Sequence, residues 1–186
     1  GGRFLRAGPA YGGSCFPKDT KGLVSASNKF KVDLSLVKTV IKSNENRVNL
    51  LIQRVHKILG KKLKNKRIAF LGVTFKPNTD DMRDSSSLKM IPYLSKKGAK
   101  LSYYDPSGEK NEFKKIKNCS YKTNIKSNCH NADLIIILTE WDEFKSIDFK
   151  KIVKNKQVKI YDLRNLYNVK DMKKNKLKYY SVGRSS

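Results

Sequence analysis

Arg67-Ile68-Ala69-Phe70-Leu71-Gly72-Val73, inside the 186-residue sequence, is the stretch that decides the fold. A short apolar run of this kind, without alternating polar residues, is typical of a parallel strand that is buried on both faces. Further apolar runs follow at residues 99–104, 134–138 and 158–161, and residues 179–182 extend the pattern as a possible edge strand. Runs that alternate with helical segments predict an α/β fold, with a parallel sheet and right-handed crossovers.

Two helices are predicted before this first strand. The first covers about residues 18–30. The second covers about residues 34–59, where apolar residues recur at helical spacing, and Gly60 supplies its stop. Its apolar stripe consists of Val37, Val40, Ile41, Val48, Leu51, Ile52, Val55, Ile58 and Leu59. At 1.5 Å per residue this helix is roughly 40 Å long, which is more than one small core needs. It either packs on its own domain alone or joins two domains.

The lysine-rich residues 61–66 read as a charged linker. They predict a boundary between a helical part, residues 1–64, and a Rossmann-like sheet domain, residues 65–186. After the first strand we expect a long loop and a helix at about residues 85–97, whose serines cap its free N–H groups. Pro92 is expected to kink this helix or to cost it a hydrogen bond.

A second informative stretch is Gly12-Gly13-Ser14-Cys15-Phe16-Pro17-Lys18-Asp19. A thiol attacks as its thiolate, and a helix N-terminus or a nearby ammonium group lowers its pKa. Cys15, just ahead of a helix opened by Pro17 and close to Lys18, is therefore a candidate nucleophile. Asp19 is a candidate acid, base or water-orienting group. From spacing alone, a small buried cysteine with no catalytic role is the alternative.

The charge is strongly unbalanced, with 41 Lys and Arg against 16 Asp and Glu, a net charge of +25. Such a balance favours nucleic-acid or anionic-membrane partners. However, the lysines are spread between the apolar runs and no nucleic-acid motif accompanies them, so we predict neither partner and attribute the charge to biased lysine usage. Apolar runs are far shorter than the roughly 20 residues that span a bilayer. Three cysteines without a metal-binding pair fit a reducing cytoplasm.

The stretch Gly12–Asp19 resembles the cysteine motif of the UDP-glucose/GDP-mannose dehydrogenase family. Ala7-Gly8-Pro9-Ala10-Tyr11, which precedes it, resembles the glycine-rich segment that leads to this motif in the family. A second block, residues 72–87 with the sequence GVTFKPNTDDMRDSSS, is similar to the family's C-terminal nucleotide-sugar domain. Shorter matches are Tyr104-Asp105-Pro106, Leu138-Thr139-Glu140-Trp141, Asp162-Leu163-Arg164 and Tyr180-Ser181-Val182-Gly183-Arg184. The resemblance covers nearly the whole chain.

This resemblance implies an enzyme that oxidises a nucleotide sugar with NAD as cofactor. By this resemblance, the sequence of residues 78–83 favours UDP-glucose as the substrate, with UDP-N-acetylmannosamine or GDP-mannose as alternatives. UDP-glucose would be oxidised at C6 to UDP-glucuronate by two hydride transfers. Cys15 would form a thiohemiacetal and then a thioester, and Asp19 would assist the water that hydrolyses it. The covalent bond would retain the aldehyde between the two oxidations.

The resemblance also assigns binding residues. Those expected at the UDP-sugar are Phe4, Leu5, Arg6, Gly8, Tyr11, Gly12, Phe75, Lys76 and Arg164. Those expected at NAD are Cys15, Lys18 and Arg83. If Lys76 has no binding role, it is an ordinary solvated lysine. If Arg164 has none, it forms a surface salt bridge.

The first strand is followed by one glycine, where a dinucleotide fingerprint has three. The sheet is therefore not expected to hold NAD, and we expect the family's N-terminal NAD domain to be missing from these residues and the chain alone to be inactive. A UDP-sugar-binding and dimerisation module without catalysis is the rival interpretation. By resemblance, the long helix forms a homodimer interface.

Overall fold

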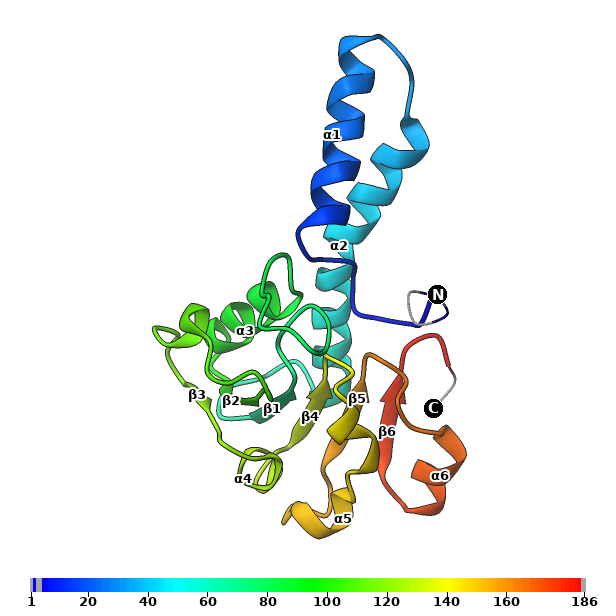
Figure 1. Cartoon of the computed structure of the whole chain (residues 1–186). Coiled ribbons are helices and arrows are strands. Elements are labelled where there is room, and N and C mark those ends of the chain that lie inside the picture. The colour runs from blue at the N-terminus through cyan, green and yellow to red at the C-terminus, as the bar shows by residue number, and fades with distance from the viewer. Residues whose placement is uncertain (1, 3–4, 185–186) are drawn as a thin grey trace.

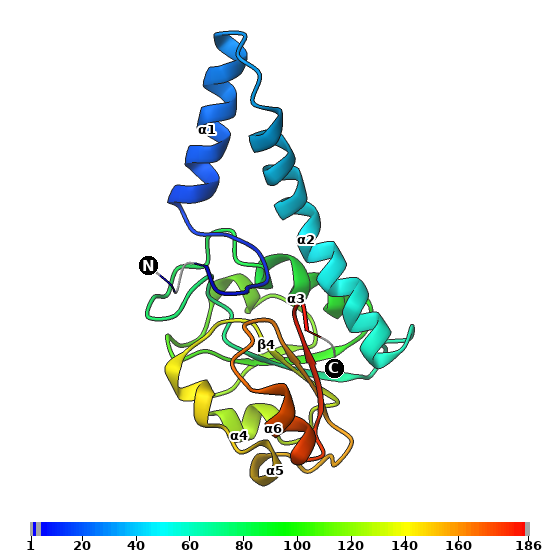
Figure 2. The ribbon, with the colours of Figure 1, turned by 90° about the vertical axis from the view of Figure 1, so that its right-hand side faces the viewer.

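The computed structural model describes residue 2 and residues 5–184 of the chain. They form a helical hairpin and a sheet that carries helices on both faces (Figure 1). The hairpin consists of α1, Cys15–Lys29, and α2, Ser35–Leu59. Its tip projects away from the sheet, whereas the C-terminal half of α2 lies beside it (Figure 2). The long helix is thus confirmed to within a residue at its start, and Gly60 is its C-cap.

The described residues form one six-stranded parallel sheet in the order β3-β2-β1-β4-β5-β6. Its strands are β1 Arg67–Leu71, β2 Lys100–Tyr104, β3 Cys119–Tyr121, β4 Leu134–Ile137, β5 Lys159–Asp162 and β6 Lys178–Ser181. The chain enters at the centre, builds outward to β3, returns to β4 and builds outward to β6. This is the doubly wound order, in which ligands bind beyond the carboxyl ends of the strands where the direction reverses, here between β1 and β4.

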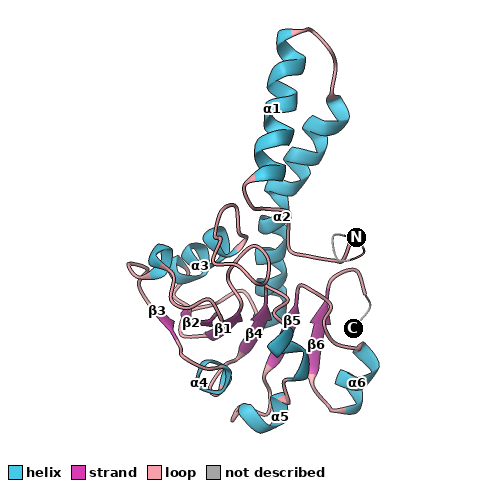
Figure 3. Ribbon diagram, in the orientation of Figure 1, coloured by secondary structure: helices cyan, strands magenta, loops and turns pink. Residues whose placement is uncertain are grey.

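Short helices connect the strands (Figure 3). They are α3 Ser87–Lys96, α4 Ile125–Cys129, α5 Phe149–Ile152 and α6 Val169–Lys174, with 3₁₀ turns η1 Asn111–Phe113 and η2 Asp142–Ser146. Because side chains alternate across a strand, the two faces have separate cores. Ile68 and Phe70 of β1 pack with α2 and α3, while Ala69 and Leu71 pack with α4, α5 and α6.

The apolar stripe of α2 is divided between two environments. Val48, Leu51, Ile52, Val55 and Ile58 are buried in the core that also holds the α2-facing side of the sheet. Toward the hairpin tip the apolar side chains of the same helix are exposed, as at Leu36 and Val40. The helix therefore anchors on the sheet with one half and extends beyond it with the other, and the boundary at 64/65 stays a prediction.

The start of α1 and several short elements differ from the expectations. Helix α1 begins at Cys15 rather than near Lys18, so the cysteine is the first residue of the helix and Pro17 lies inside its first turn. β3 and helices α4 to α6 were not predicted, because they are short and carry too few apolar residues to show a period.

Ser86, the N-cap residue of α3, forms no capping hydrogen bond with its side chain, whereas the hydroxyl oxygen of Ser85 accepts the N–H of Ser87 at 3.3 Å. The hydroxyls of Ser85 and Ser87 each donate to the carbonyl oxygen of Val73 at 2.6 Å. They hold the long loop after β1 against the start of α3. The helix continues through Pro92, which is exposed.

Candidate functional site

Three loops meet beyond the carboxyl edge of the sheet. They follow β1 (residues 72–86), β4 (residues 138–141) and β5 (residues 163–168), as the parallel order requires. The β1 loop carries Phe75, Lys76 and Arg83, and the β5 loop carries Arg164. The fold therefore brings Arg164 to the same edge as three predicted binding residues of the β1 loop that are distant from it in the sequence.

The loops are held by buried carboxylates at strand ends. Asp105, after β2, accepts hydrogen bonds from the backbone N–H of Val73 at 2.7 Å and of Thr74 at 3.3 Å. Asp162, at the end of β5, accepts from Arg164 N–H, Leu166 N–H and the hydroxyl of Tyr179. Burial raises the pKa of Asp162, and these donors partly offset that effect.

The crevice where a dinucleotide would bind is closed. A Cβ on Gly72 would lie 2.5 Å from Cβ of Thr139, whose hydroxyl donates to the carbonyl oxygen of Thr74 at 2.6 Å. The acidic residue after the second strand, which binds ribose hydroxyls in a dinucleotide site, is committed here to the backbone of the β1 loop. One glycine after β1 and a carboxylate already bound to the loop do not match the pattern of a dinucleotide site, and that this sheet does not hold NAD stays a prediction.

Arg164 is the most enclosed of the predicted binding cations at this edge, with a side chain that is 12% exposed, whereas Lys76 and Arg83 are exposed. Its Nε–H donates to the carbonyl oxygen of Leu138 at 2.8 Å, and NH2 donates to that of Phe75 at 2.9 Å. Nε also lies 2.8 Å from Oε2 of Glu140. Because the Nε–H is aligned with Leu138, the contact with Glu140 is an ion pair without a hydrogen bond. Arg164 and Glu140 thus form a salt bridge, but both side chains are largely enclosed, so it is not a salt bridge of the exposed surface.

Burial lowers the pKa of Arg164, and the charges of Glu140 and Asp162 oppose that effect. A guanidinium that is fixed at three points and charged in this enclosed place is suited to recognise an anionic ligand. Glu140 was not predicted as a site residue. The signal that could have identified it is its position directly after a buried strand at the switch point.

The N-terminal segment lies across these loops, in close contact at three glycines. Cβ atoms placed on Gly8 and Gly12 would lie 2.9 Å from NH1 of Arg164 and 2.6 Å from the carbonyl oxygen of Asp84. Gly13 has a φ of +82°, lies against the ring of Phe75, and donates its N–H to the carbonyl oxygen of Arg83 at 2.8 Å. The glycines therefore allow the backbone of this segment to lie close to the loops.

Cys15 is exposed at the start of α1. Its Sγ lies 3.6 Å from the hydroxyl oxygen of Ser14. The first turn of α1 contains no acidic residue, so the positive end of the helix dipole is not offset there. Lys18 and Asp19 are exposed on the next turn, with Nζ and Oδ1 3.8 Å apart. A thiol in this place is accessible to a ligand.

Arg83 projects from the β1 loop and forms a two-point pair with Asp81, Nε to Oδ1 at 2.9 Å and NH2 to Oδ2 at 2.8 Å. The Arg83 guanidinium lowers the pKa of Asp81, and the carboxylate raises that of Arg83. Asp81 also accepts the backbone N–H of Arg83 at 2.9 Å and so shapes the loop. The guanidinium of Arg83 remains largely exposed.

The other predicted residues are spread more widely. Lys76 is exposed, with Nζ 5.2 Å from the ring centroid of Phe75. Tyr11 is half-buried against Phe16, whereas Leu5 and Arg6 are exposed at the start of the described segment. Phe4 lies outside the described residues.

The remaining cysteines differ from Cys15. Burial raises the pKa of the Cys119 thiol to about 11 and that of Cys129 to about 12. Since a thiolate is the reactive form, both are poor nucleophiles.

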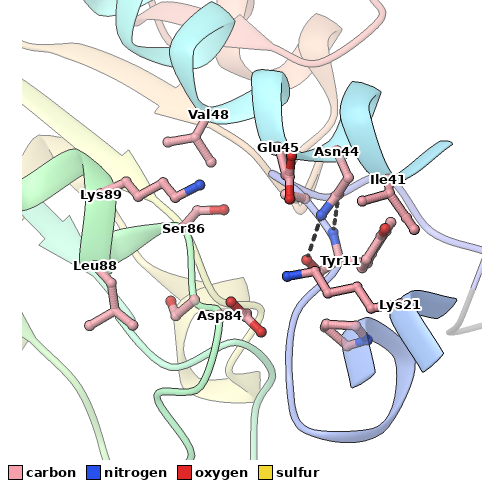
Figure 4. Close-up of a pocket in the computed structure, with 13 residues that line it drawn as sticks. Tyr11, Lys21, Ile41, Asn44, Glu45, Val48, Asp84, Ser86, Leu88 and Lys89 are labelled. Carbon is pink, nitrogen blue, oxygen red and sulfur yellow. Dashed lines mark hydrogen bonds between the residues drawn. The ribbon is translucent and has the colours of Figure 1, made fainter. Parts of the chain in front are cut away.

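A hollow of about 170 Å³ opens beside this segment, between α2 and the start of α3 (Figure 4). Asn44 projects from α2 into its rim and binds the backbone of Tyr11. By contrast, the space around Arg164 itself is filled. Among residues 2 and 5–184, no cluster of three metal-ligating side chains and no helix able to cross a membrane is found.

The doubly wound sheet, its closed dinucleotide crevice and the cysteine segment across its carboxyl edge define a Rossmann-like nucleotide-binding domain with an appended thiol site. The chain belongs to the UDP-glucose/GDP-mannose dehydrogenase family. Residues 69–169 match the model of the family's UDP binding domain, and residues 1–46 match that of its central domain.

A UDP-glucose 6-dehydrogenase of Rhizobium meliloti is 40% identical over 185 residues, which cover 99% of this chain and 42% of that protein. The chain thus spans less than half the length of this relative. Among solved structures, a UDP-glucose dehydrogenase from Pyrobaculum islandicum has a TM-score of 0.77 at 24% identity, covering 95% of this chain and 38% of that one. A UDP-D-ManNAc dehydrogenase from Pyrococcus horikoshii has a TM-score of 0.75 at 26% identity, covering 95% and 40%.

Proposed function

We propose that this chain is the nucleophile-bearing and UDP-sugar-binding part of an NAD-dependent UDP-glucose 6-dehydrogenase. The observation that carries the proposal is the contact between two segments. Gly8, Gly12 and Gly13, which lead to Cys15, lie against Arg164, Asp84 and Phe75 of the sheet's carboxyl edge. A ligand held at this edge therefore lies next to the segment that ends in the thiol.

The sugar nucleotide would be held by both sides of this contact. Arg164 is the fixed cation for the diphosphate, and Lys76 adds a second, mobile charge from the β1 loop. Since the structure leaves no room for a ligand beside Arg164, binding requires the residues before Pro9, which include Gly8, to move outward. The residues of the N-terminal segment predicted to contact the sugar nucleotide are Phe4, Leu5, Arg6, Gly8, Tyr11 and Gly12.

In the proposed reaction Sγ of Cys15 adds to the C6 aldehyde that the first oxidation produces, giving a thiohemiacetal. Its oxidation gives a thioester, which water hydrolyses to the carboxylate and the free thiol. Asp19, on the same exposed face of α1, orients that water and takes its proton. NAD supplies the hydride acceptor for both oxidations. Lys18 and Arg83 are the exposed cations that would face it.

The choice of UDP-glucose rests on the names of relatives such as the Rhizobium meliloti protein and on the wording of residues 78–83. The fold does not separate the sugars, because a UDP-D-ManNAc dehydrogenase shares it. The closed crevice favours a second function for the chain when it is on its own, which is UDP-sugar binding without catalysis.

Calorimetry with UDP tests this site. We expect the chain to bind UDP and the Lys76→Ala variant to bind it about tenfold more weakly, which is roughly 1.4 kcal/mol for one charge-assisted contact. Lys173→Ala, on the exposed surface of α6, is the control and should bind as the wild type does. Equal affinities for all three proteins would remove Lys76 from the site. No binding by the wild type would overturn the proposed function itself.

We also propose that α2 mediates a homodimer and that the protein resides in a reducing cytoplasm. Residues 1–64 and 65–186 are the two proposed domains of the chain. The α1–α2 hairpin exposes large apolar side chains, among them Phe30 at 72%, Leu36 at 76% and Val32 at 55%. An apolar surface of this kind is a candidate subunit interface. All three cysteines are free thiols, as a reducing compartment would keep them.

Sedimentation velocity tests the interface. The chain should sediment as a dimer, and Leu36→Lys should shift it to a monomer, because a charge would be buried at the contact. Glu112→Lys places a lysine on exposed η1 and should leave the dimer intact. A monomeric wild type, or an undisturbed Leu36→Lys dimer, would contradict the interface.

A further inference from the structure

The side chain of Asn44, on α2, binds the backbone of the segment that leads to Cys15. Oδ1 of Asn44 accepts a hydrogen bond from Tyr11 N–H at 2.9 Å, and Nδ2 donates to the carbonyl oxygen of Tyr11 at 3.1 Å. The two residues are 33 positions apart in the sequence. Figure 4 shows both bonds, with the amide of Asn44 directed from the helix onto the Tyr11 backbone. A backbone residue whose donor and acceptor are both satisfied by one side chain is fixed in position and in orientation.

The same segment is held on either side of Tyr11. Nε of Arg47, on the following turn of α2, donates to the carbonyl oxygen of Pro9 at 3.2 Å. On the other side, Gly13 donates its N–H to the carbonyl oxygen of Arg83 at 2.8 Å. Only Ser14 then separates this anchor from Cys15. The position of the thiol is therefore set between α2 and the β1 loop.

Helix α2 gives Asn44 a fixed place relative to the sheet. Immediately after Asn44, the helix begins its buried stripe with Val48 and continues it to Ile58 against the sheet. In the other direction it extends into the exposed half of the hairpin. Asn44 thus lies at the point where the anchored half of the helix becomes the free half.

We propose that Asn44 is a positioning residue for Cys15, which transmits the placement of α2 to the nucleophile through the Tyr11 backbone. This inference rests on the proposed function for its chemistry, but not for its structural part. The side-chain amide of Asn44 supplies both the donor and the acceptor that Tyr11 uses, on two adjacent atoms. Aspartate keeps the acceptor and sets a negative charge against a carbonyl oxygen, and leucine of similar size supplies neither.

Amide hydrogen exchange on the chain tests the structural part. In Asn44→Leu, exchange at Tyr11 and Gly13 should accelerate at least tenfold, while exchange at Ile136 in the central strand β4 stays within twofold. Asn44→Asp keeps the acceptor for Tyr11 N–H and loses the donor to its carbonyl oxygen, so it should accelerate exchange at Gly13 and, by a smaller factor than the leucine variant, at Tyr11. It serves where the leucine variant does not fold. Asn46→Leu, on the exposed face of the same helix, should change none of the three. Acceleration at Tyr11 with an unchanged Gly13 would overturn the proposal, and so would equal acceleration at Ile136.

Kinetics test the positioning role in a protein that joins this chain to a dinucleotide-binding domain. A misplacement of about 1 Å can cost on the order of 100-fold in rate, so kcat of Asn44→Leu should fall at least tenfold with KM for UDP-glucose within threefold. Unchanged kcat would overturn the role. Should Cys15→Ser retain full activity while the exchange results hold, the proposed chemistry would fail and the grip of Asn44 on the segment would stand.

Discussion

Cys15→Ser is expected to lower UDP-glucuronate formation by on the order of 10³-fold or more, in a protein that joins this chain to a dinucleotide-binding domain. Serine lacks a thiolate, so it forms neither a stable adduct with the aldehyde nor a thioester. Because the first oxidation does not use the thiol, the variant should still transfer the first hydride. The measurement is the ratio of NADH to UDP-glucuronate formed, followed together by absorbance and chromatography.

Two controls accompany this experiment. Cys119→Ser removes a thiol whose pKa burial raises to about 11, and it should keep the wild-type rate of acid formation. The 186-residue chain alone should form no NADH from UDP-glucose, because its own sheet closes the dinucleotide crevice. A Cys15→Ser protein that forms acid at the wild-type rate would contradict the covalent mechanism. NADH formation by the chain alone would contradict the assignment of its sheet.

Gly72→Ala is expected to lower the free energy of unfolding by about 3 kcal/mol, measured by urea denaturation. Gly72 has a φ of +75°, which an alanine adopts only with strain. The added methyl group would also lie 2.5 Å from Cβ and 3.1 Å from Cα of Thr139. Neither atom can move away by a side-chain rotation, so β1 and the β4 loop would have to separate.

Gly108→Ala is the matched control. Gly108 also has a positive φ, +90°, but a Cβ there would meet nothing within 4 Å. The control should therefore cost about 1 kcal/mol, which is the backbone strain alone. The difference between the two variants measures the contact at the crevice. If both lost the same stability, the crevice would be open enough to accept a methyl group, and the argument against a dinucleotide in this sheet would weaken.

Much of the fold follows from local pattern. The run at residues 67–73 has no polar residue in its strand interior, and it becomes β1, paired on both sides at the centre of the sheet. The stripe of the long helix predicts α2 almost residue by residue. Hydrophobic period could not reveal β3, Cys119–Tyr121, because its two outer residues are only partly buried, its middle residue is exposed and its place depends on pairing with β2.

The candidate site divides in the same way. Sequence alone determined its chemical groups, namely the thiol of Cys15 between glycines and a lysine, the arginines of two strand-end loops, and a first strand without a dinucleotide fingerprint. Each of these is a matter of residue type and short spacing.

Only the tertiary structure decided how these groups relate. It brings Gly8 against Arg164, pairs Arg164 with Glu140, and joins Asn44 to Tyr11. The physical reason is that these contacts depend on which strand ends share an edge and on which face of α2 meets the N-terminal segment. Burial and backbone geometry of that kind arise from the packing of elements distant in sequence, and no local pattern encodes them.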